Sequence, residues 1–105
     1  MNQFDIFRNK NQKSSKVVPF LINLQSDPMD LLVSRIVAPL RKEADYSDQK
    51  ISRIHIPISI ENEEYIIFIS ELAAVPLELM GERVMNAAAL RQEFTSAIDL
   101  LFTGF

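Results

Sequence analysis

The sequence contains no cysteine and no tryptophan, and it has a single histidine and only two glycines. Without cysteine the chain has no disulfide, no thiolate nucleophile and no cysteine-based zinc site, and it tolerates a reducing compartment. One histidine is too few for a histidine-rich metal site, and Gly81 and Gly104 alone do not make a glycine-rich phosphate loop. These absences predict that the protein uses no metal and no cofactor.

An excess of positive charge and a long apolar run are also missing. The formal net charge is −3, whereas binding to phosphate backbones or anionic lipid rests on clustered lysine and arginine. There is no run of about 18 apolar residues, and the polar start of the chain lacks the apolar segment of a secretion signal. We therefore expect a soluble cytoplasmic protein with no direct sequence-specific nucleic acid binding and no membrane segment.

The composition that remains is that of a globular protein. Of 105 residues, 48% are hydrophobic and 24% are charged, which argues against extended disorder and is enough for one core. No repeat or linker divides the chain, so we predict a single domain over residues 1–105. Within it we predict strands over roughly residues 3–80 and a C-terminal helix over roughly residues 86–103.

The helix prediction rests on apolar residues at helical spacing near the end of the chain, namely Leu90, Phe94, Ala97, Ile98, Leu101, Phe102 and Phe105. Asn86 is placed to cap the first turn, and Gly104 allows the backbone to leave the helix. The opposite face is polar and carries Asp99 and Thr103. Leu100 fits neither face, which predicts that it contacts a partner subunit.

The strand predictions rest on alternation. Residues 53–60 alternate between isoleucines, on a predicted core face, and polar residues including His55, on a predicted solvent face. Residues 65–69 are apolar on both faces, which indicates a central strand. Residues 17–24 and 33–40 are also predicted strands.

Turn and charge signals separate these strands. Residues 25–28 end in Asp-Pro, a turn signal, and residues 41–50 are charged and predicted to be a solvated connection. Residues 8–16 are cationic and predicted to form an exposed hairpin loop, and residues 81–82 are predicted to interrupt the pattern before the helix. About five antiparallel strands followed by one helix predict a mainly β fold, a small twisted sheet or barrel with the helix packed on it.

Few residues are able to exchange protons or attack a substrate. His55 lies on an alternating strand, where a structural role is favoured, and the clustered carboxylates Glu61, Glu63 and Glu64 belong to a predicted solvated turn. This sparse inventory predicts no catalytic residue and a protein that is not an enzyme.

Several stretches taken together resemble the CcdB family, the gyrase-poisoning toxins of toxin–antitoxin pairs. They are Gln3-Phe4, Leu24-Gln25-Ser26-Asp27, Ile36-Val37-Ala38-Pro39-Leu40, Ala73-Ala74-Val75-Pro76, Gly81-Glu82 and Ala97-Ile98-Asp99-Leu100-Leu101-Phe102-Thr103-Gly104-Phe105. The resemblance spans nearly the whole chain. It implies a small SH3-like antiparallel barrel, of the kind shared by CcdB and MazF proteins, followed by a C-terminal helix and assembled as a homodimer.

The resemblance also implies a target. Family members bind the A subunit of DNA gyrase and trap the enzyme on cleaved DNA, which blocks replication and transcription. The implied gyrase-binding residues are Ser26, Pro28, Met29, Asp99, Thr103, Gly104 and Phe105. Thr103 stands where the family pattern has a tryptophan that stacks on an arginine of gyrase, and threonine cannot stack. Phe102 or Phe105 is then left to supply the aromatic surface.

A second implied partner is a CcdA-like antitoxin, typically an acidic disordered segment that folds on binding. The cations expected to attract it are Arg8, Lys10, Lys13, Arg41 and Lys42. Two alternatives stay open at this point. One is a MazF-type ribonuclease toxin that cleaves messenger RNA, for which the charge and the single histidine are unfavourable. The other is an interaction domain without a toxic role.

Overall fold

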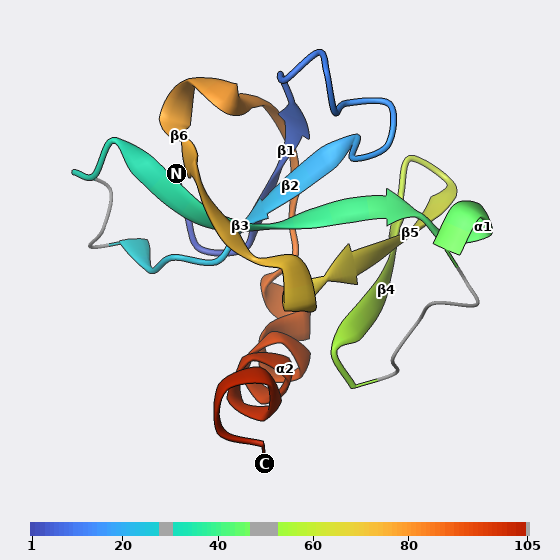
Figure 1. The fold of residues 1–105 in the computed structure, drawn as a ribbon, viewed down its shortest axis with the longest axis vertical. Coiled ribbons are helices and arrows are strands. Elements are labelled where there is room, and N and C mark those ends of the chain that lie inside the picture. Colours follow the sequence, from blue (N-terminus) through green and yellow to red (C-terminus); the bar gives the residue numbers. More distant parts are fainter. Residues whose placement is uncertain (28–30, 47–52, 105) are drawn as a thin grey trace.

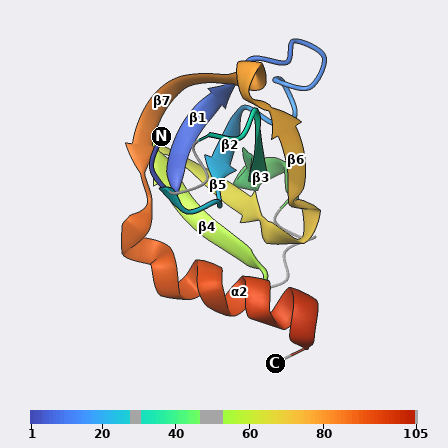
Figure 2. The same ribbon diagram turned by 90° about the vertical axis from the view of Figure 1, so that its left-hand side faces the viewer.

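The structure is a computed structural model that describes residues 1–27, 31–46 and 53–104. Within these ranges a curled β-sheet is followed by a C-terminal helix, which lies below the sheet in Figures 1 and 2. The strands are β1 (Asp5–Asn9), β2 (Phe20–Asn23), β3 (Ser34–Lys42), β4 (His55–Ile60), β5 (Glu63–Phe68), β6 (Ala73–Pro76) and β7 (Met80–Asn86). The α-helices are α1 (Glu43–Tyr46) and α2 (Arg91–Thr103), and short 3-10 turns occupy Ile69–Glu71, Leu77–Leu79 and Ala88–Leu90.

All strand pairs are antiparallel, in the order β4-β5-β3-β2-β1-β7. The long strand β3 has two neighbours on one edge, because its first half pairs with β6 and its last residues pair with β5. The sheet curls into a half-barrel, and α2 runs past its open side (Figure 2). The prediction of a mainly β, SH3-like fold with one C-terminal helix is confirmed.

The core lies between the concave face of the sheet and α2. Phe94 and Ala97 are the fully buried residues of the helix, and the Phe94 ring packs against the ring of Phe4 with centroids 4.9 Å apart. Strand β5 pairs on both edges, and its residues Tyr65–Phe68 are buried, as predicted for a central strand. A helix face and a two-sided apolar strand are local patterns, so the sequence is sufficient to place them.

The last strand differs from the prediction, because Gly81 and Glu82 lie inside β7 instead of interrupting it. The register between β1 and β7 shifts at two places, around Phe7, where β7 carries extra residues. Such bulges bend a strand and increase its twist. At Gly81 a Cβ atom would lie 2.9 Å from the carbonyl oxygen of Arg8, so the glycine allows a close approach between the strands.

The helix also begins later than predicted. Asn86 is the final residue of β7, a 3-10 turn follows, and α2 starts at Arg91. Asn86 Oδ1 does accept a hydrogen bond from the Ala88 N–H (2.8 Å), as a helix cap would. Its side-chain amide, however, donates to the Gln3 carbonyl (3.0 Å) and to Asp5 Oδ1 (2.9 Å). These bonds to the start of the chain hold Asn86 in the sheet.

Two further predictions about surface residues were wrong. Arg41 and Lys42 belong to β3 and not to a solvated connection, which leaves α1 directly after them. His55 was expected on the solvent face but is 4% exposed. Its ring stacks on Phe68 at 4.3 Å, and its Nε2 shares a hydrogen bond with Ser70 Oγ (3.0 Å). Alternation holds at Pro57 and Ser59, which are exposed, and fails only at His55, where Phe68 and Ser70 cover the ring.

Candidate protein-interaction site

The exposed end of α2 carries most of the predicted gyrase-binding residues that the structure describes. Asp99, Thr103 and Gly104 are exposed. The Thr103 hydroxyl donates to the Asp99 carbonyl (2.6 Å), so this hydroxyl is already occupied within the helix. Gly104 ends the helix in the left-handed conformation (φ 79°), and its N–H donates to the Leu100 carbonyl (3.0 Å). Phe105 lies outside the described residues. The helix end thus presents a carboxylate beside a closed, rigid cap.

The sequence makes two competing predictions for Phe102, because the family resemblance also offers its ring as exposed aromatic surface. Helical spacing put it on the core-facing stripe, yet its side chain is 68% exposed. The reason is position around the helix: Leu101, one residue earlier, is partly buried and packs on the core, whereas Phe102 lies at the edge of the stripe. Its place at the edge of the stripe was the available signal.

The second predicted segment, the turn after β2, lies at the other end of α2. Ser26 is exposed and borders a polar hollow with Asn86, Ala88 and Arg91, the first residue of the helix. A helix of 13 residues is about 20 Å long, so one chain does not bring Ser26 next to Thr103. Pro28 and Met29 lie outside the described residues.

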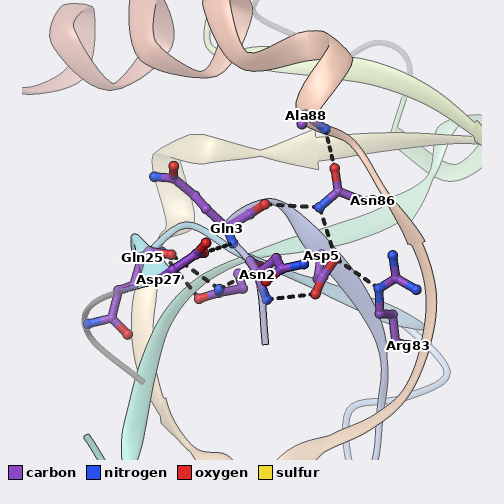
Figure 3. Close-up of polar contacts among 9 residues, drawn as sticks. Asn2, Gln3, Asp5, Gln25, Asp27, Arg83, Asn86 and Ala88 are labelled. Carbon is purple, nitrogen blue, oxygen red and sulfur yellow. Dashed lines mark hydrogen bonds and ion pairs between the residues drawn. The ribbon is translucent and has the colours of Figure 1, made fainter. Parts of the chain in front are cut away.

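A polar network holds this turn, the start of the chain and the end of β7 together (Figure 3). At its centre Asp5 is 2% exposed. Asp5 Oδ1 accepts from Arg83 Nε (2.9 Å) and Asn86 Nδ2 (2.9 Å), and Oδ2 accepts from the Asn2 N–H (2.8 Å). Burial on its own raises the pKa of Asp5, but these hydrogen bonds outweigh burial and hold the pKa below its ordinary value. The carboxylate therefore stays ionised and fixes the network.

Leu100, the predicted partner-subunit contact, is half-buried. It belongs neither to the fully buried core nor to the partly buried residues that pack on the core. No described contact assigns it to an interface, and its role stays a prediction.

The five predicted antitoxin-binding cations do not form one patch. Arg8 on β1 is ion-paired with Glu61 (3.1 Å) and Glu82 (3.2 Å). Arg8 lies in register with Phe20 and, through it, with Leu40. Because cross-strand partners share a sheet face and consecutive residues alternate, Arg41 lies on the opposite face.

The cations on β3 are also engaged. Arg41 pairs with Glu71 and lies over the ring of Phe68 (4.8 Å), and Lys42 Nζ lies 3.5 Å from a carboxylate oxygen of Glu63. Lys10 and Lys13 belong to the loop after β1 and are exposed, without an ion pair to any residue that the structure describes. Antitoxin binding by these cations stays a prediction.

The part of the chain that the structure describes contains the single histidine and all acidic side chains except Asp30 and Asp48. Within it, no three histidine or acidic side chains gather closely enough to hold a metal ion, and His55 is buried against Phe68. None of the helices in residues 1–27, 31–46 and 53–104 has the length and apolar character needed to span a membrane.

A small curled β-sheet followed by a C-terminal helix defines a protein of the SH3-like barrel class. A family model described as CcdB protein matches residues 3–104 of the 105-residue chain, so the chain belongs to the CcdB family. The family implies a toxin of a toxin–antitoxin pair that acts on gyrase and has an antitoxin partner. It does not favour the MazF-type ribonuclease alternative.

Proposed function

We propose that this protein binds the A subunit of DNA gyrase as a homodimer in the cytoplasm and traps gyrase on cleaved DNA. The proposed contact residues are Ser26, Pro28, Met29, Asp99, Thr103, Gly104 and Phe105, to which we add Phe102. A CcdA-like antitoxin is the proposed second partner. No catalytic residue takes part, so the protein acts in proportion to its amount.

The exposed ring of Phe102 is the observation that carries this proposal. A large aromatic side chain that is 68% exposed contributes little to the core. On a helix end, beside the carboxylate of Asp99 and a fixed Gly104 cap, it offers planar apolar area of the kind that anchors protein interfaces. A ring there also accepts an arginine of the target through a cation–π contact, in place of the family tryptophan at position 103.

Poisoning follows from selective binding and needs no reaction. A ligand shifts an equilibrium only by its difference in affinity between two states. If the helix ends fit the gyrase A pair only when its DNA gate is cut and open, each bound dimer disfavours resealing. Two-fold symmetry in the toxin matches the two-fold symmetry of the gyrase A pair.

An exposed apolar surface beside β3 and β6 supports the homodimer. It comprises Leu31, Leu32, Val33, Ile36 and Leu77, with exposed fractions from 38% to 95%. The Leu77 N–H donates to the Val33 carbonyl (3.0 Å), which joins the two segments. Arg35, the one charged residue within residues 31–37, buries its side chain and donates to the Leu32 and Ser34 carbonyls. An uncharged apolar surface is typical of a protomer contact.

We therefore expect Val33→Glu to convert the dimer to a monomer, because a desolvated carboxylate has no partner there. Leu100→Glu is the matched substitution at Leu100, the residue that helical spacing predicts to contact the partner subunit. Sedimentation velocity of the wild type and both variants measures the result. A monomer from Leu100→Glu and a dimer from Val33→Glu would move the interface to α2.

The gyrase activity itself is tested with purified enzyme. We expect added protein to inhibit supercoiling and to accumulate cleaved DNA, in proportion to dimer per gyrase. Unchanged levels of cleaved DNA and of turnover at excess protein would refute the proposal. Incubation of the same preparation with messenger RNA tests the alternative, since multiple-turnover cleavage would establish a ribonuclease.

A further inference from the structure

All four polar groups of Gln3 are hydrogen-bonded, and each bond reaches a different residue. The Gln3 backbone N–H donates to Asp27 Oδ1 (2.8 Å), and its carbonyl accepts from Asn86 Nδ2 (3.0 Å). In the side chain, Nε2 donates to the Leu24 carbonyl (3.1 Å), and Oε1 accepts from Arg91 Nη1 (3.0 Å). One residue thus joins both ends of the turn after β2 to the end of β7 and the start of α2.

The backbone around Gln3 is held firmly enough to act as an anchor. The Asp5 N–H donates to the Asn2 carbonyl (3.2 Å), which closes a tight turn over Gln3 and Phe4. Phe4 adopts the left-handed conformation (φ 69°), unfavourable for a residue with a Cβ atom. Such a conformation persists only when its surroundings enforce it. Here the buried Phe4 ring, packed on Phe94, fixes it.

Other hydrogen bonds hold the turn only to the sheet. Asn23 Nδ2 donates to the Gln25 carbonyl (3.2 Å), and the Ile36 N–H donates to Gln25 Oε1 (3.0 Å). The hydrogen bonds of Gln3 reach further, because they lead from the turn to Arg91 at the start of α2. Ser26, between Leu24 and Asp27, is exposed, and its position is set by the hydrogen bonds that Gln3 makes to these two neighbours.

We propose that Gln3 is a positioning residue that sets the turn after β2 relative to α2, so that Ser26 meets the same target as the helix end. The expected effect of Gln3 on target binding rests on the proposed function, which is gyrase binding. Its structural part, the coupling of the turn to α2 through one glutamine, applies to the free protein.

Gln3→Met is the variant that tests it, because methionine keeps the length of the side chain and both backbone bonds while removing the bonds to Leu24 and Arg91. We expect hydrogen exchange of the Leu24 and Gln25 amides to accelerate about tenfold, since local opening of the turn becomes easier. Exchange of the Phe94 amide, within α2, should not change. Unchanged exchange at Leu24 and Gln25, or equal acceleration in α2, would overturn the inference whatever the target is.

Binding to a gyrase A fragment supplies the second readout. Loss of two hydrogen bonds that order the turn, one of them donated by the charged Arg91 guanidinium, should weaken binding about tenfold. If Gln3 acts through the turn, Gln3→Met should cost much less once Ser26→Ala is present, and should add fully to Phe102→Ala at the far end of the helix. Wild-type protein that fails to bind gyrase refutes the proposed function. Wild-type binding together with undiminished binding by Gln3→Met, or additivity with Ser26→Ala, refutes the positioning role.

Discussion

Deletion of residues 103–105 should abolish gyrase inhibition and leave the melting temperature of the protein unchanged. Thr103 and Gly104 are exposed, and a Cβ atom at Gly104 would meet nothing within 4 Å. The buried residues of α2, Phe94 and Ala97, lie two turns earlier. Of the described residues, the deletion therefore removes Thr103 and Gly104 from the proposed contact surface and none from the core. Supercoiling inhibition and thermal unfolding, measured on the same preparation, check both halves.

A single substitution sharpens this prediction. Phe102→Ala should weaken gyrase binding about thirtyfold, the loss typical of an aromatic hot-spot residue, without lowering the melting temperature. Val17→Ala is the matched control, because Val17 is 51% exposed and lies in the loop before β2. A deletion variant that loses its dimer and melts earlier would instead place the tail in the structural core.

Replacement of Asp5 by alanine should lower the free energy of unfolding by about 3 kcal/mol, because it removes a buried carboxylate that accepts three hydrogen bonds, one of them from the charged Arg83 guanidinium. Arg83, Asn86 and the Asn2 N–H all donate to this carboxylate, which is 2% exposed. Urea unfolding of Asp5→Ala beside wild type measures the loss. Asp45→Ala, in exposed α1, is the control and should change stability by less than about 0.5 kcal/mol.

The same carboxylate makes stability depend on pH in one direction. The pKa of Asp5 in the folded protein lies below the ordinary value of 3.8. The contribution of the ionised Asp5 carboxylate to folding stability is therefore fully present above pH 3.8. It is lost as the pH falls through the pKa of Asp5 in the folded protein. The wild type should lose stability over this acid range, and Asp5→Asn, which does not titrate, should lose less. Equal acid sensitivity of the two proteins would show that Asp5 is not the responsible group.

The sequence predicts what local patterns determine. Alternating isoleucines in β4, the two-sided apolar run of β5 and the apolar stripe of α2 each specify an element and its buried face. These were sufficient for the fold class. The strand β6, with its sequence Ala-Ala-Val-Pro, has too short and weak a pattern to be identified, and it forms because β3 offers an edge.

What the sequence did not predict depends on contacts between distant residues. Asn86 has the chemistry of a helix cap, but partners more than 80 positions away keep it in β7. Phe102 has core-facing spacing, but it lies at the edge of the stripe and is exposed, whereas the neighbouring Leu101 packs on the core. In the sequence, only the family resemblance singles out Gln3. Its four hydrogen bonds reach residues from 21 to 88 positions away. The sequence therefore identified residues of the proposed contact surface but did not predict how they are arranged.

The placement of Arg8 and Arg41 on opposite faces of the sheet restricts the shape of any partner that touches both. A rigid domain meets a protein on one side, so it would engage either the β1 cation or the β3 cation. A flexible acidic strand is able to pass around the rim of the sheet and reach both. The geometry of the sheet thus favours a flexible antitoxin that wraps around the protein, compared with a rigid antitoxin domain that binds on one side.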